Sequence, residues 1–92
     1  MYTPTRQIKI TTEIICAYSE EIEHVIKLYE SDVYSFSDAL QTIKIKTNST
    51  LQVLDTLNEK DIICFANYEI SRKWVLDICE EAEDRLYDAK GE

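Results

Sequence analysis

The residues with the clearest chemical character in this sequence are the carboxylates near its C-terminus. Residues 76–92 carry seven acidic side chains but only one arginine and one lysine. A solvated helix usually interleaves acids with lysines, because like charges one turn apart repel each other by a few tenths of a kcal/mol. So much unpaired negative charge on one element predicts a basic partner. The acids that we expect to contact this partner are Asp77, Glu80, Glu81, Glu83, Asp84 and Asp88.

A helix would place these acids in a row. Four of them follow one another at steps of four, three and four residues, so at about 100° per residue they fall within an arc of roughly 60°. These four are Asp77, Glu81, Asp84 and Asp88. At a rise of about 1.5 Å per residue, the six acids span roughly 17 Å, or about one charge per 3 Å. A single DNA strand carries one charge per about 3.4 Å, so the two linear charge densities are similar.

The other arc of the same segment is apolar and predicts a face that packs on a protein core. Its residues are Ile70, Trp74, Val75, Ile78, Cys79, Ala82 and Leu86. The sequence therefore predicts a long acidic C-terminal helix.

A second long helix is predicted near the N-terminus, starting with Thr12 as its cap. Apolar residues recur there at steps of three and four, which indicates one buried face; they are Ile14, Ile15, Tyr18, Ile22, Val25, Ile26, Tyr29 and Val33. Acids lie on the opposite arc, and Lys27 is spaced to pair with Glu23 and Glu30. We expect Glu20, Glu23 and Glu30 to form a second acidic row.

The middle of the chain allows two interpretations. Residues 7–12 and 42–47 both alternate and are rich in β-branched side chains, which slightly favours two short paired strands. Against this, Phe36, Leu40 and Ile43 have helical spacing. Ser49 is expected to cap a short separate helix, and residues 61–66 fit either a strand or a helical turn. The predicted fold class is α+β, mainly helical with at most a small sheet, and the alternative is an all-α bundle.

Length and composition limit the possible architectures and partners. The 92 residues predict one domain, 1–92, whose small core would benefit from a homodimer. The net charge of −8 argues against direct binding to nucleic acid or to anionic membranes. No signal peptide or bilayer-spanning stretch is visible, so we expect a cytoplasmic protein.

Catalytic and metal-binding patterns are scarce. His24 is the only histidine and is expected on the polar face of its helix. Cys16, Cys64 and Cys79 are widely spaced and are expected to be buried. No phosphate-binding loop or nucleophile elbow is present. The sequence thus predicts no enzyme activity, no cofactor and no metal site.

The acidic end CEEAEDRLYDAKGE, the opening MYTPTRQIKITTEI, the near absence of glycine and proline, and the full length together resemble the anti-restriction nuclease (Arn) proteins of T-even bacteriophages. Members of that family are described as DNA mimics. The resemblance implies a phage inhibitor for evading host defence, acting inside the infected bacterium. The implied partners are a modification-dependent restriction nuclease and nucleoid DNA-binding proteins.

Two other classes of function remain open at this point. One is an acidic adaptor or transcription co-regulator that binds a basic partner through an apolar groove, with Tyr34, Tyr68 or Tyr87 as contacts. The other is a small hydrolase that uses clustered carboxylates and a divalent metal. If the protein is a DNA mimic, reversing the charge of the acidic row should abolish inhibition. If the partner binds through an apolar groove, the same change should only slow its association.

Overall fold

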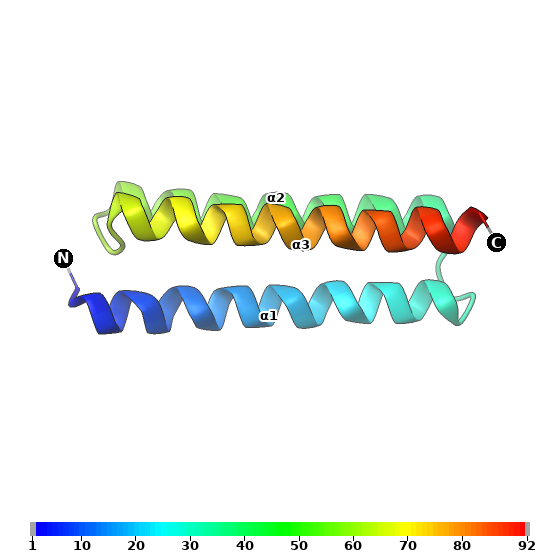
Figure 1. The fold of residues 1–92 in the computed structure, drawn as a ribbon, viewed down its shortest axis with the longest axis horizontal. Helices are drawn as coiled ribbons and strands as arrows, with labels where there is room; N and C mark the ends of the chain where they lie inside the picture. The colour runs from blue at the N-terminus through cyan, green and yellow to red at the C-terminus, as the bar shows by residue number, and fades with distance from the viewer. Residues whose placement is uncertain (1, 92) are drawn as a thin grey trace.

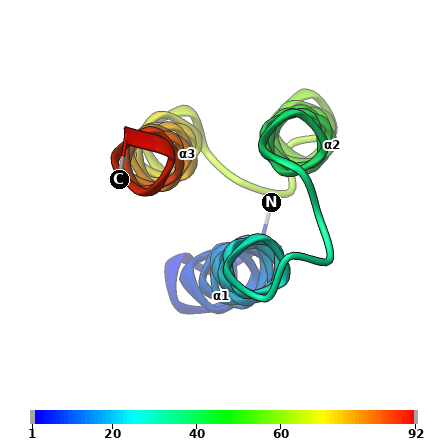
Figure 2. The ribbon, with the colours of Figure 1, turned by 90° about the vertical axis from the view of Figure 1, so that its right-hand side faces the viewer.

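Three long helices make up the computed structural model, which describes residues 2–91. They are α1 (Pro4–Glu30), α2 (Phe36–Glu59) and α3 (Phe65–Gly91). Figure 1 shows that the helices run side by side, with α1 and α3 pointing in one direction and α2 in the other. Viewed along the long axis, they occupy the corners of a triangle (Figure 2). The bundle is a rod with principal extents of 48 × 16 × 15 Å.

The core is a continuous column of apolar side chains along the axis of the rod. All three helices and the second loop contribute to it, so each helix packs on both of the others. The buried apolar residues are Ile15, Tyr18, Ile22, Val25, Ile26, Ala39, Ile43, Leu54, Ile63, Val75, Ala82 and Leu86.

The predicted α+β fold is wrong, and the all-α alternative describes the protein. Residues 7–12 lie within α1 and residues 42–47 lie within α2, so they do not pair as strands. No strand occurs anywhere between residues 2 and 91. Ile43 and Ile45 would face the same side of a strand, but in α2 the first is fully buried and the second is 57% exposed.

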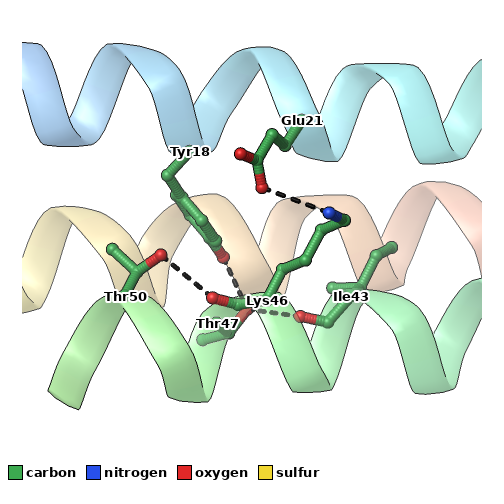
Figure 3. Close-up of polar contacts among 6 residues, drawn as sticks. All are labelled: Tyr18, Glu21, Ile43, Lys46, Thr47 and Thr50. Carbon is green, nitrogen blue, oxygen red and sulfur yellow. Dashed lines mark hydrogen bonds and ion pairs between the residues drawn. The ribbon is translucent and has the colours of Figure 1, made fainter. Parts of the chain in front are cut away.

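The helical period of residues 7–12 and 42–47 is difficult to recognise in the sequence because some residues on their buried faces are polar. Thr11 and Thr47 are both buried, and each hydroxyl donates to a carbonyl one turn back, on Gln7 at 3.1 Å and on Ile43 at 2.7 Å. These bonds satisfy the hydroxyls inside the bundle. Thr47 also contacts the Tyr18 hydroxyl at 2.6 Å (Figure 3), which links α1 to α2. The close-up also shows the ion pair between Lys46 and Glu21 at 3.2 Å.

The helix ends differ from the predicted ones. Helix α1 begins at Pro4, eight residues before the predicted cap, and the Thr3 hydroxyl accepts from the Arg6 amide at 3.2 Å. Proline suits this position because the first helical amide needs no partner. Ser49 lies inside α2 and caps nothing, whereas the Ser35 hydroxyl caps α2 by accepting from the Asp38 amide at 3.1 Å.

Both loops reverse the chain with the same turn. Asp32 has φ 61° and Asp61 has φ 57°, a left-handed conformation that aspartate tolerates better than most residues. The next amide donates to a carbonyl five residues back, from Val33 to Leu28 and from Ile62 to Leu57, each at 2.9 Å. This is the Schellman pattern of helix termination. It ends α1 before Val33, which is 64% exposed and not part of the buried face as predicted.

The buried face of α3 covers only part of the predicted arc. Val75, Ala82 and Leu86 are buried as predicted, but Ile70 is 61% exposed and Trp74 is 55% exposed. The predicted arc from Ile70 to Cys79 is about 180° wide, more than two neighbouring helices can cover. Its uncovered side flanks α1, where it becomes part of the surface described next.

Candidate functional site

Five of the six predicted C-terminal acids form an exposed row on α3. We call Asp77, Glu80, Glu81, Asp84 and Asp88 the α3 acidic row; all five side chains are exposed. The sixth, Glu83, is half-buried, and its Oε1 accepts a hydrogen bond from the Cys79 thiol at 3.2 Å. Burial raises the pKa of the Cys79 thiol, which keeps it protonated as the donor. Glu83 therefore lies beside the row and not on it.

Neighbouring cations leave most of this charge uncompensated. Among residues 2–91, the row makes one ion pair, between Lys73 Nζ and Asp77 Oδ2 at 3.7 Å. Both side chains are more than half exposed, at 78% and 59%. A surface pair of this kind is worth about 0–1 kcal/mol. The row thus presents a nearly full set of carboxylates to a partner.

The three acids predicted on α1 are exposed, but their surroundings differ. Glu23 pairs with Arg85 of α3, and not with Lys27 as predicted from their spacing. The hydrogen bond to Glu23 raises the pKa of Arg85, with Glu30 and Glu81 adding to the effect. These acids therefore gather around one cation at the α1–α3 boundary. Glu20 is not part of this cluster but shares a shallow recess with Glu23, together with His24 and Lys27.

We expect Arg85→Gln to strengthen the negative surface with little loss of stability. The pair with Glu23 is exposed, so its removal should change the free energy of unfolding by less than about 1 kcal/mol. Binding of an oligolysine peptide should tighten about twofold at low salt, because a cation is lost amid three acids. Titration calorimetry and urea unfolding measure the two effects. Lys44→Gln removes an exposed cation from α2 and should leave peptide affinity nearer to that of the wild type; destabilisation by more than about 2 kcal/mol in Arg85→Gln would show a structural bridge instead.

A second feature adjoins the acids, an apolar groove between the N-terminal halves of α1 and α3. We call it the α1–α3 groove; its volume is about 500 Å³. Ile8, Ile70 and Trp74 line it and are 60%, 61% and 55% exposed. The buried polar residues Thr11 and Ser71 also line it. The sequence prediction missed this groove because it assigned Ile70 and Trp74 to the core; the excessive width of the apolar arc was the available signal.

The tyrosines predicted for an adaptor groove lie in separate places. Tyr34 is half-buried in the first loop. The Tyr68 hydroxyl donates to Asp55, and that hydrogen bond raises the pKa of Tyr68. Tyr87 packs edge-on against Phe36, with ring centroids 5.0 Å apart. About 28 Å of helix separates Tyr68 from Tyr87, so the three rings do not form one groove.

The cysteines are less buried than predicted. Cys16 is exposed, so the prediction that all three cysteines are buried is wrong, while Cys64 and Cys79 are half-buried. Residues 2–91 contain no cluster of three or more histidine, cysteine or acidic side chains placed to hold a metal ion. Over the same residues, none of the helices combines the length and the apolar character needed to cross a bilayer.

Comparison of the chain with protein-family models, with curated proteins and with solved structures finds no match in any of the three. The resemblance to the anti-restriction nuclease proteins therefore stays a prediction. A proposal for function has to rest on the acidic surface and on the groove beside it.

Proposed function

We propose that this protein is an inhibitor that occupies the DNA-binding surfaces of other proteins by presenting carboxylates in place of phosphates. The observation that carries the proposal is the α3 acidic row, five exposed carboxylates with a single weak ion pair. The proposed targets are a modification-dependent restriction nuclease and nucleoid-associated DNA-binding proteins of a bacterial host. No catalysis is required, because the inhibitor acts by occupancy.

The charge density of the row supports this proposal. From Asp77 to Asp88 the row covers roughly 17 Å of helix, so its five carboxylates give about one charge per 3.3 Å. Phosphates follow each other along one DNA strand at about 3.4 Å. A surface with lysines and arginines spaced for phosphates can therefore pair with several carboxylates at once. The net charge of −8 also attracts such a surface from a distance.

The stiffness of the bundle supports it as well. The row lies on a helix of 27 residues that packs along its length on α1 and α2. Its carboxylates are held on a preformed backbone, so binding orders fewer groups than it would on a flexible acidic tail. Glu23 and Glu30 of α1 add charge near Glu81, which widens the negative surface across two helices.

Competition with DNA tests the proposal. A fluorescent DNA duplex is bound to a purified target of each proposed class, and displacement by this protein is followed by fluorescence anisotropy. We expect displacement that weakens as salt rises, because the contacts are between charges. The triple variant Glu81→Lys, Asp84→Lys, Asp88→Lys should displace DNA at least about tenfold less well, since it replaces three attractive contacts with repulsive ones.

A matched variant separates the row from net charge. Glu13→Lys, Glu59→Lys and Glu69→Lys also change three exposed acids, and three changes of two charges each take the net charge from −8 to −2 in both triples. We expect this control to stay within about threefold of the wild type, because distant exposed charges are screened. Equal losses in both triples would contradict the assignment of the site to α3. Absence of displacement by the wild type from both target classes would refute the function.

A further inference from the structure

We infer that the α1–α3 groove is an anchor site for the same partner: it receives a large apolar side chain from a helix whose lysines and arginines contact the α3 acidic row. This inference rests on the proposed function and adds the chemistry of the segment that is bound. The occupant is an amphipathic basic helix of a DNA-binding protein, apolar at one end and cationic at the other.

The exposure of the groove walls is the first observation. Ile8, Ile70 and Trp74 are each more than half exposed, although all three are large apolar side chains. They surround one groove of about 500 Å³, which is within the range of protein binding pockets and leaves room for a large apolar side chain. Clustered apolar exposure on a soluble protein indicates an interaction site more often than scattered exposure does.

Continuity between the groove and the acids is the second observation. Trp74, which lines the groove, lies on the same helix as the acids. Asp77, Glu81 and Asp88 follow it at three, seven and fourteen residues. These steps correspond to about 4.5, 10 and 21 Å along the helix. A partner helix aligned with α3, with its apolar side chain in the groove, would therefore place cations about two and four turns away opposite Glu81 and Asp88.

The polar floor of the groove is the third observation. Asn67 Oδ1 accepts from the Ser71 hydroxyl at 3.1 Å and lies 3.3 Å from the Thr11 hydroxyl, whose proton goes to the Gln7 carbonyl. Asn67 Nδ2 is buried and has no hydrogen-bond partner among residues 2–91. An unsatisfied buried donor is costly, and a carbonyl or hydroxyl oxygen of an occupant could accept from it after a small rotation of the amide.

Charge favours a basic partner over a second copy of this chain. Each chain carries −8, and Asp77 and Glu81 lie within two turns of Trp74. A second copy docked on the groove brings like charges together, whereas a basic helix brings opposite ones. The groove and the row thus select for the same occupant.

The position of the only tryptophan allows a direct test. Trp74 lines the groove and is 55% exposed, so its fluorescence reports on occupancy. Two synthetic helical peptides without tryptophan or tyrosine are compared. Both carry lysines at seven and fourteen residues from one test position, which is leucine in one peptide and serine in the other. We expect the leucine peptide to bind about tenfold more tightly, to shift Trp74 emission to the blue and to protect it from acrylamide quenching.

Paired groove variants provide the control. Ile8→Ser with Ile70→Ser should remove the advantage of the leucine peptide without changing binding of the serine peptide. Ile45→Ser with Val53→Ser alters two exposed apolar residues that line a recess between α1 and α2, and should retain the advantage. All four side chains are at least 46% exposed, so both variants should fold.

The possible outcomes separate this inference from the proposed function. Equal affinity for both peptides with unchanged Trp74 emission, alongside normal displacement of DNA, would overturn the groove inference and leave the function standing. A blue shift that grows with concentration of the protein alone, and disappears in Ile8→Ser with Ile70→Ser, would assign the groove to a second copy and overturn it too. If the wild-type protein does not displace DNA, both the proposed function and the groove inference are refuted.

Discussion

Replacing Ile43 with alanine is expected to lower the free energy of unfolding by about 2–5 kcal/mol, the range for removing a large aliphatic side chain from a core. Ile43 is fully buried on the face of α2 that packs into the bundle. Few neighbouring groups can collapse into the space, because all three helices surround the same narrow core. Urea unfolding followed by circular dichroism measures the loss.

The matched control lies two residues further along the same helix. Ile45 has the same side chain but is 57% exposed, so Ile45→Ala should change stability by less than about 0.5–1 kcal/mol. In a strand, positions 43 and 45 would face the same side and the two substitutions would have similar costs. Similar measured losses would therefore contradict the helical assignment of residues 42–47.

This contrast also shows what the sequence could predict of the fold. The long N-terminal and C-terminal helices were predicted correctly, because apolar residues such as Ile15, Ile22 and Ile26 repeat over several turns. The two predicted strands rested on short runs of alternating residues. In the first run, the buried residues that continue the helical period of α1 are Gln7 and Thr11, and both are polar. Gln7 stays buried because its side chain donates to the Tyr2 carbonyl at 2.6 Å and accepts from the Cys64 amide at 2.8 Å, a tertiary pairing that no local pattern reveals.

The loops carried a signal that the prediction did not use. Scarcity of glycine correctly favoured helices, but it also concealed where they end. Residues 31–36 and 60–65 each have aspartate second, a β-branched residue third and phenylalanine last, and in both segments the aspartate adopts the left-handed turn. Recognising this repeat would have placed both helix ends and given three helices of similar length.

For the candidate site, local spacing was a better guide than pairing across helices. Asp77, Glu81 and Asp88 are exposed on one helix because their spacing alone fixes their side of it. The spacing favoured Lys27 as the partner of Glu23, but the observed partner is Arg85, which is 62 residues away in the sequence. The rotation of α3 about its axis, which exposes Trp74, depends on how all three helices pack and is not encoded in α3 alone.

A second large effect is expected at alkaline pH, from the buried hydroxyl of Tyr18. This side chain is 2% exposed and its hydroxyl contacts Thr47 at 2.6 Å. Burial raises the pKa of Tyr18 from 10.0 to about 12, because the phenolate would lose its hydration. The unfolded chain therefore releases this proton at a lower pH than the folded protein does.

The sign of the effect follows from proton binding. Below the unfolded pKa of 10.0 both states hold the proton, and stability does not depend on it. As the pH rises through the interval between 10.0 and about 12, the unfolded state is increasingly favoured by ionisation, so stability is lost. Between about pH 8 and about pH 11, Tyr18 alone should cost about 1.4 kcal/mol of unfolding free energy.

Tyr18→Phe isolates this contribution because phenylalanine keeps the ring and cannot ionise. At neutral pH the variant should lose about 1 kcal/mol with the hydrogen bond, while Thr47 still donates to the Ile43 carbonyl. All other ionisable groups are present in both proteins, so their effects cancel in the difference between the two urea midpoints. That difference should shrink or reverse as the pH is raised. If the two proteins instead lose stability in parallel up to about pH 11, the pKa of Tyr18 is the same in the folded and the unfolded state. That result would contradict the tight packing of α1 on α2 around Thr47.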